Sequence, residues 1–131
     1  MRRLIVGGAA DPQQPGDRPA EQYALSIAAT CALARAFAGG GYDVAVDDVL
    51  APGAFERLWR PQLDGLDWML VVVLPSLDEA LARSASRGKR VLEEHTRAQH
   101  ALCSSWPAGV RIDTTGLSVE ESLALVRGRL G

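Results

Sequence analysis

The stretch Val44-Ala45-Val46-Asp47-Asp48-Val49 decides the fold that this sequence predicts, because a short apolar run ends there in two adjacent carboxylates. An apolar run this short and rich in β-branched residues indicates a buried strand over Tyr42 to Asp47. Ligands of parallel sheets gather beyond the carboxyl ends of the strands. Asp47 and Asp48 are therefore candidates for holding Mg²⁺ beside a phosphate or for acid–base catalysis. The alternative is that one of the two aspartates caps a turn or the next helix.

Helices and strands alternate on both sides of this stretch, which predicts an α/β fold. Pro19 to Ala38 carries apolar residues at helical spacing, and the Gly39-Gly40-Gly41 run stops that helix. Trp68 to Leu74 is apolar on both faces, as in a central parallel strand covered by helices. Val110 to Asp113 is a shorter strand. We expect a single domain over residues 1–131, with a short, mainly parallel sheet between two layers of helices.

The remaining helices are predicted from local signals. Pro52 to Leu63 carries large apolar residues on one side, and Val91 to Ser104 is a charge-rich helix. Ser76-Leu77-Asp78-Glu79 is a capping box, in which serine and glutamate three residues apart satisfy free backbone N–H groups at a helix start. Ser118-Val119-Glu120-Glu121 is a second capping box and begins the terminal helix.

The length, composition and net charge of the chain restrict the class of protein to which it can belong. The 131 residues suffice for one domain, and hydrophobic residues make up 47% of them. The net charge of −2 gives no support for a nucleic-acid partner. The longest apolar run is far too short to span a membrane. Cys31 and Cys103 lack CxxC spacing and are expected to be reduced thiols. We therefore expect a cytoplasmic protein with neither nucleic acid nor membrane as partner.

Two further groups of residues are candidates for chemistry. The basic cluster Arg83, Arg87, Lys89 and Arg90 could clamp phosphates, although spacing alone favours a solvated polar face. Asp113 ends a strand and so points to the same rim as the aspartate pair, but a turn-forming role is the favoured interpretation. The spacing of the two histidines, five residues apart, does not fit a helical zinc site.

The order of the motifs resembles the later part of small P-loop phosphotransferases. These are AAA-type kinase-like proteins similar to chloramphenicol phosphotransferase, gluconate kinase and zeta toxins. The resemblance covers nearly the whole chain, and the order and spacing of the motifs carry it more than any single motif. The segments that carry it are Asp47-Asp48-Val49, Leu70 to Leu77, Ala82 to Val91, Trp106-Pro107 and Ile112 to Ser118.

The resemblance implies ATP and Mg²⁺ as cofactors and a small molecule as substrate. It also implies that the paired acidic position lies near the magnesium and phosphates, that an arginine-rich lid covers the nucleotide, and that the loop after the last strand borders the adenine. The implied residues are Asp47 and Asp48 for catalysis and metal binding, Arg83, Arg87 and Arg90 for phosphate in a lid over 83–91, and Asp113, Thr114, Thr115 and Gly116 for the nucleotide.

The chain departs from this family in one respect. Family members open with a strand, a GxxxxGK loop followed by Ser or Thr, and a helix, whereas this sequence has no such motif and its only lysine is Lys89. That loop and its lysine hold the β- and γ-phosphates. We therefore expect a phosphotransferase-like chain that is inactive or impaired as given. The alternative is a non-catalytic interaction module that forms a homodimer through its uncovered sheet. A receiver-like signalling domain is disfavoured because Pro75 follows Leu74 directly.

Overall fold

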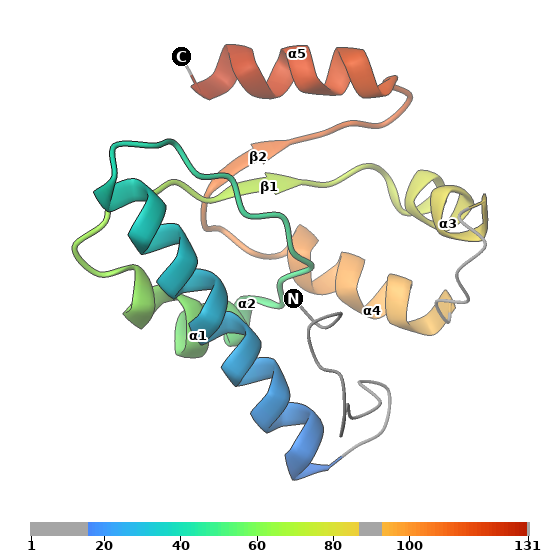
Figure 1. Ribbon diagram of the computed structural model, residues 1–131. Coiled ribbons are helices and arrows are strands. Elements are labelled where there is room, and N and C mark those ends of the chain that lie inside the picture. Colours follow the sequence, from blue (N-terminus) through green and yellow to red (C-terminus); the bar gives the residue numbers. More distant parts are fainter. Residues whose placement is uncertain (1–15, 87–92, 131) are drawn as a thin grey trace. The chain divides into compact units, whose positions relative to one another are not determined.

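The computed structural model describes residues 16–86 and 93–130. The chain divides into two compact units, one ending at Asp67 and the other beginning at Trp68 (Figure 1). Each unit has its own buried side chains. Those of the first unit are Ile27, Cys31, Phe55 and Trp59, and those of the second are Val72, Trp106, Ile112 and Thr114.

The first unit begins with the long helix α1, Asp17–Gly39, which confirms the helix predicted over Pro19 to Ala38. The backbone N–H of Gly40 donates to the carbonyl oxygens of the last helical turn, and the N–H of Gly41 donates to the Ala38 carbonyl at 2.9 Å. Gly41 has a φ of 86°, in the left-handed region where a residue with a Cβ is strained. The glycine run therefore ends the helix as predicted.

A second helical segment in this unit changes its pitch twice. It consists of α2 (Pro52–Ala54), the π-helical turn η2 (Phe55–Trp59) and the 3₁₀ turn η3 (Arg60–Leu63), and it confirms the helix predicted over Pro52 to Leu63. Pro52 stands at the first turn, where its missing N–H costs nothing. The wide π-helical turn has buried side chains at both its first and its last residue, and η2 contacts α1.

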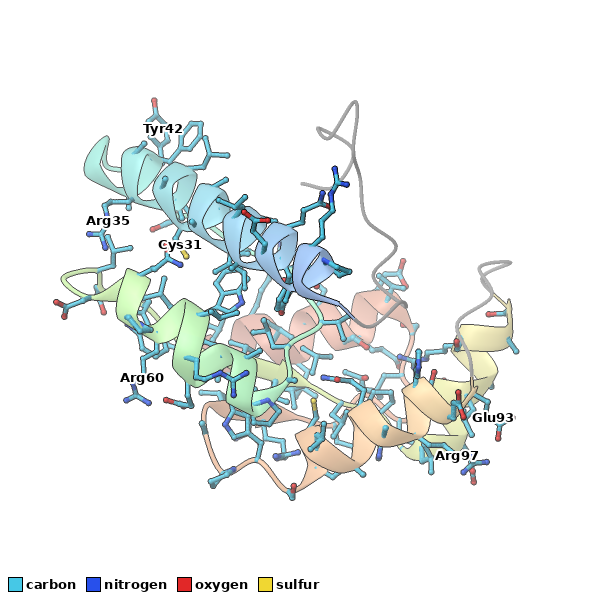
Figure 2. All side chains as sticks on the ribbon, turned by 90° about the horizontal axis from the view of Figure 1, so that it is seen from below. Cys31, Arg35, Tyr42, Arg60, Glu93 and Arg97 are labelled. Carbon is cyan, nitrogen blue, oxygen red and sulfur yellow. The ribbon has the colours of Figure 1, made fainter. Side chains whose placement is uncertain are left out.

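Arg35 ties the end of this segment to α1. Its Nη2 donates to the carbonyl oxygens of Gln62 at 2.8 Å and of Asp64 at 2.9 Å (Figure 2). One guanidinium therefore satisfies two carbonyl groups at and just beyond the end of η3, where the helix itself supplies no partner. Cys31, one turn earlier on α1, is buried.

The predicted strand over Tyr42 to Asp47 is wrong. Residues 42–50 form neither strand nor helix, and the side chains of Val44 and Val46 are 42% and 46% exposed. A strand exists only where a neighbouring strand accepts and donates its backbone hydrogen bonds, and the described part of the first unit holds no such neighbour. The β-branched residues indicate a tendency to form a strand, but the pairing of that strand does not follow from propensity.

The second unit contains a short parallel sheet. Strand β1, Val71–Val73, pairs with β2, Val110–Ile112, so that Val72 lies opposite Arg111. Both strands lie within predicted ones but are shorter. Val73 is 50% exposed, so the expected burial of this strand on both faces is wrong for the described residues. The parallel pair and the helices around it are those of an α/β chain, while the three-layer arrangement stays a prediction.

Gly109 fixes the entry to β2. Its φ is 82°, and a Cβ placed there would lie 2.7 Å from the carbonyl oxygen of Leu70. That carbonyl accepts a hydrogen bond of 2.8 Å from the N–H of Val110, which extends the ladder by one step. Only glycine allows the turn and the close approach of the two backbones together.

Three helices complete the second unit: α3 (Leu77–Ser86), α4 (Glu93–Ser104) and α5 (Val119–Leu130). The chain therefore runs from β1 through α3 and α4 to the parallel β2, a helical crossover of the kind that parallel strands require. An exposed ion pair between Glu93 and Arg97, at 2.7 Å, joins adjacent turns of α4 (Figure 2).

The two predicted capping boxes differ in completeness. At α5 the box is reciprocal: the N–H of Glu121 donates to Ser118 Oγ at 3.1 Å, and the N–H of Ser118 donates to Glu121 Oε2 at 2.8 Å. At α3 the N–H of Glu79 donates to Ser76 Oγ at 3.3 Å, whereas the N–H of Ser76 donates to Thr115 Oγ1. The second box is therefore confirmed in full and the first in half.

None of the helices that the structure describes combines the length and the apolar character that crossing a bilayer requires.

Candidate functional site

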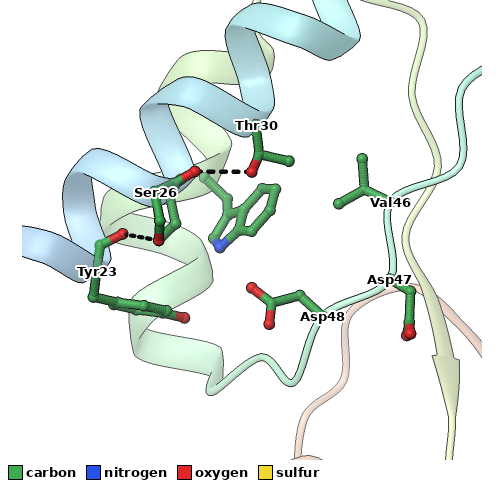
Figure 3. Close-up of a pocket in the computed structure, with 8 residues that line it drawn as sticks. Tyr23, Ser26, Thr30, Val46, Asp47 and Asp48 are labelled. Carbon is green, nitrogen blue, oxygen red and sulfur yellow. Dashed lines mark hydrogen bonds between the residues drawn. The ribbon is translucent and has the colours of Figure 1, made fainter. Parts of the chain in front are cut away.

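A cleft of about 290 Å³ lies within the first unit (Figure 3). Helix α1 supplies one wall through Tyr23, Ser26, Ile27 and Thr30. These positions are spaced three and four residues apart, so they share one face of the helix. Trp59, at the end of the π-helical turn, also lines the cleft.

The irregular segment before α2 brings the predicted aspartate pair to this cleft, together with Val46. Asp48 directs its carboxylate toward the α1 side chains, whereas Asp47 points away from them (Figure 3). Asp48 Oδ1 accepts a hydrogen bond of 2.8 Å from the N–H of Val49, which holds the carboxylate in place. The two aspartates therefore face different surroundings although they are adjacent in sequence.

The two aliphatic hydroxyl groups of the α1 wall, those of Ser26 and Thr30, both donate their protons to the helix backbone. Ser26 Oγ donates to the carbonyl oxygen of Tyr23 at 2.7 Å, and Thr30 Oγ1 donates to the carbonyl oxygen of Ser26 at 2.8 Å. A hydroxyl that has given its single proton away offers only lone pairs to a ligand. At Ser26 and Thr30 the α1 wall therefore presents hydrogen-bond acceptors.

Tyr23 and Trp59 are the polar aromatic residues of the cleft. Burial, and then the negative charge of Asp48, raise the pKa of Tyr23, and the nearby indole N–H of Trp59 opposes this shift. Trp59 is 5% exposed, and its Nε1 is buried without a hydrogen-bond partner among the residues that the structure describes. The phenol oxygen of Tyr23 is the acceptor that this buried donor faces, although the geometry of the contact is too poor for a full hydrogen bond.

The aspartate pair fits one type of magnesium site. Mg²⁺ is usually held by one or two carboxylates, with substrate phosphates and water completing its shell. The described residues contain no cluster of three or more His, Cys, Asp or Glu side chains that could form an all-protein cage. The binding of Mg²⁺ by Asp47 and Asp48 stays a prediction.

In the second unit, the structure brings one predicted phosphate-binding arginine to the predicted nucleotide loop. Arg83 Nη2 donates to the carbonyl oxygens of Thr114 at 3.0 Å and Leu117 at 3.3 Å, while its Nε pairs with Glu79 at 2.9 Å. Arg83 thus joins α3 to the loop after β2. Its predicted contact with phosphate stays a prediction.

The loop after β2 is held by Asp113. Its Oδ1 accepts hydrogen bonds from the side-chain hydroxyl of Thr115 at 2.6 Å and from the Thr115 N–H at 2.8 Å, and these bonds lower the pKa of Asp113. This is the turn-forming role expected of an aspartate before a Thr-Thr-Gly sequence. Gly116 follows with a φ of 69°. These hydrogen bonds lie within the loop, so its contact with adenine stays a prediction.

Comparison with known proteins identifies the family. The family model described as chloramphenicol phosphotransferase-like protein matches residues 3–131. The chain belongs to the chloramphenicol phosphotransferase-like family. No curated protein and no solved structure matches it. Membership confirms the resemblance drawn from the order of the motifs, and this family is one of P-loop kinase-like phosphotransferases.

Some predicted residues of this chloramphenicol phosphotransferase-like chain lie outside the described part. They are Arg87, Lys89 and Arg90 of the basic cluster. Of the predicted lid over 83–91, the structure therefore describes only the end of α3. The arginine lid stays a prediction.

Sequence reasoning on this chloramphenicol phosphotransferase-like chain missed four polar residues of the cleft. Tyr23 and Trp59 lie in predicted helices whose apolar spacing hides their polar atoms, and nothing in the sequence distinguishes Ser26 and Thr30 as site residues. The available signal was polar side chains at i, i+3 and i+7 within an apolar stripe, since such residues need a partner when the stripe is buried. The buried Thr114, whose Oγ1 has no hydrogen-bond partner among the described residues, is predicted only through the family resemblance.

Proposed function

We propose that this chain is a small-molecule phosphotransferase of the P-loop kinase-like type, with its acceptor site in the cleft of the first unit. The family match over residues 3–131 supports the reaction class. The observation that carries the proposal is the placement of Asp48, which directs its carboxylate into a cleft of about 290 Å³ while Asp47 stands beside it. A cleft of this size suits a small organic molecule.

The roles of the two aspartates follow from their surroundings. Asp47 faces away from the α1 wall and holds Mg²⁺, which neutralises charge on the phosphates when it is bound. Asp48 faces the interior of the cleft and accepts the proton of the attacking hydroxyl. The nearby Tyr23 stays protonated at neutral pH because its pKa is raised. In this proposal Arg83 positions the loop over Asp113 to Gly116 against the nucleotide.

Phosphate binding limits the activity that these 131 residues can have by themselves. The 131 residues contain no GxxxxGK motif followed by Ser or Thr. The backbone N–H groups and the lysine of that motif make most of the contacts that bind the β- and γ-phosphates. We therefore propose weak nucleotide binding and impaired phosphoryl transfer for this chain by itself. The three-layer arrangement of the sheet belongs to the same proposal.

Calorimetric titration with Mg-ATP tests the proposal. The wild-type chain is expected to bind Mg-ATP, and the double variant Asp47→Ala/Asp48→Ala is expected to lose that binding. Asp43→Ala is the matched control, because Asp43 is an exposed aspartate of the same segment that does not line the cleft. Equal binding by the wild type and the double variant would contradict the assigned roles. No heat at millimolar Mg-ATP would contradict nucleotide binding by this chain.

Self-association without catalysis is the second candidate function. Val44, Val46 and Val49 are exposed in an irregular segment that pairs with no strand among the described residues, and Val73 is exposed on the sheet. Extended chain with free backbone groups favours pairing with another chain. Size-exclusion chromatography with light scattering measures this directly. A dimer supports the interaction module, and a monomer at high concentration contradicts it.

A further inference from the structure

Helix α5 of the second unit carries an apolar stripe that is exposed to solvent. Val119 is 80% exposed, Leu123 47% and Leu130 45%. Together with the half-buried Val126 they are spaced four, three and four residues apart, so they lie on one face of the helix. Helix α5 contacts β2, but this contact leaves most of the stripe uncovered.

The stripe is complementary to itself when two copies of α5 run antiparallel. A spacing of four, three and four residues is the same in both directions along the chain. One register therefore places Leu130 of each copy opposite Val119 of the other, and Leu123 opposite Val126. Each leucine then meets a valine, at the alternating spacing by which paired helices pack their side chains.

Two charged side chains beside the stripe favour the same orientation. Glu120 follows Val119 and Arg127 follows Val126, so these two exposed residues lie on the same flank of the stripe. In the antiparallel register, Glu120 of one copy lies next to Arg127 of the other, and the two-fold axis repeats this contact. A parallel pair would instead bring each charge near a like charge. The charges of α5 are therefore complementary to those of a second, antiparallel copy.

We propose that the exposed face of α5 is the interface of a homodimer in which the α5 helices of two copies of this chain pair antiparallel. Two stripes of this size bury less than the ~1,200 Å² of a standard interface, so we expect a weak dimer with a dissociation constant of about 100 μM. The interface requires neither nucleotide nor magnesium. It also differs from the valine segment over residues 44–49, through which the second candidate function operates.

Sedimentation equilibrium of the full chain, from about 5 to about 500 μM, tests this inference, and the average mass is expected to rise from that of a monomer toward that of a dimer. Leu123→Glu places a carboxylate in the middle of the stripe and is expected to weaken the dimer about tenfold or more. Leu125→Glu is the matched control, because this exposed leucine lies about 200° around the helix axis from Leu123. Circular dichroism checks that both variants keep their helices. Equal association of Leu123→Glu and the wild type would overturn the inference.

Charge reversal tests the orientation without changing the apolar stripe. Glu120→Arg makes both flanking residues positive and Arg127→Glu makes both negative, so each variant alone is expected to dimerise about tenfold more weakly than the wild type. An equimolar mixture of the two variants restores opposite charges at both contacts and is expected to dimerise as the wild type does. Glu120 and Arg127 are seven residues apart and do not contact each other within one helix, so an effect on a single chain predicts no rescue on mixing. A mixture that stays monomeric would overturn the inference.

The remaining outcomes separate this interface from the other proposals. A wild-type chain that stays monomeric over the whole concentration range would overturn the inference. A dimer that persists in Leu123→Glu but dissociates in Val44→Glu would also overturn it and would support pairing through the valine segment. A dimer that dissociates in Leu123→Glu and persists in Val44→Glu would support it. Mg-ATP titration decides only the phosphotransferase proposal, because the α5 interface involves no residue of the cleft.

Discussion

The two units differ in how the β-branched stretches of the sequence fold. In the second unit, Val71–Val73 finds a parallel partner in β2, and Val72 becomes part of the core. In the first unit, Val44 to Val46 has an equally strand-like sequence but remains unpaired and exposed. The difference lies outside either stretch, because the second unit supplies a neighbouring strand through its helical crossover and the described first unit does not.

The comparison separates local signals from signals that need a distant partner. The capping box at Ser118 and Glu121 and the glycine stop after α1 form as predicted, because all their hydrogen bonds lie within a few residues. Strand β1, by contrast, pairs with β2, which lies tens of residues later in the chain. The β-propensity of a stretch describes only its tendency to form a strand, and it does not specify the partner strand.

The largest expected effect is on the β1–β2 pairing itself. Gly109→Ala forces a Cβ against the Leu70 carbonyl at a left-handed φ, and we expect a loss of about 2–4 kcal/mol in the free energy of unfolding. Urea denaturation followed by circular dichroism measures it. The control is Gly128→Ala in α5, where nothing lies within 4 Å of the added Cβ, and it is expected to gain about 0.5–1 kcal/mol. Similar effects of the two substitutions would contradict the role of Gly109.

The same substitution in the two valine stretches tests the comparison most directly. Val72→Thr places a hydroxyl at a position that is 8% exposed and is expected to cost about 2 kcal/mol, because the hydroxyl lacks a partner there. Val44→Thr changes an exposed position and is expected to stay within about 0.5 kcal/mol. Urea denaturation of both variants measures the two changes in the free energy of unfolding. A large cost at Val44 would mean that its segment is paired in solution and would restore the predicted strand.

Capping is expected to give a smaller effect. Ser118→Ala removes the acceptor for the Glu121 N–H from a reciprocal box and is expected to cost about 1 kcal/mol. Ser76→Ala removes one longer bond of 3.3 Å from a half-formed box and is expected to cost less. Thermal unfolding of the two variants compares them, and the reverse order would contradict the structural distinction between the boxes.

The smallest expected effect is a dependence on pH at the start of α5. Hydrogen bonds from Ser118 lower the pKa of Glu121, so this carboxylate stabilises the fold above its unfolded pKa. That contribution is lost as the pH falls through the lowered pKa, because the group is then protonated in both states. Amide hydrogen exchange of α5 in the acid range should accelerate less in Glu121→Gln than in the wild type. Parallel pH profiles in both proteins would contradict the assignment.

The sequence predicted the positions of the described helices and of both described strands, because these follow from periodicity, glycine and capping signals. It did not predict which valine stretch would pair, since that depends on distant chain. For the candidate site, Asp47 and Asp48 were found because two adjacent carboxylates are conspicuous. Tyr23 and Trp59 were missed because they meet only when α1 packs on the π-helical turn, and no local pattern encodes that packing.

The bond from Arg83 to the Thr114 carbonyl has a consequence for how the chain can vary in length. It joins positions 31 residues apart, and the pairing of Val73 with Ile112 closes a similar span. Once such a loop is closed at both ends, the entropy of closure grows only logarithmically with its length, and doubling the loop costs about 0.6 kcal/mol. Insertions or deletions in the connection between α3 and α4 are therefore expected to change the free energy of unfolding only slightly.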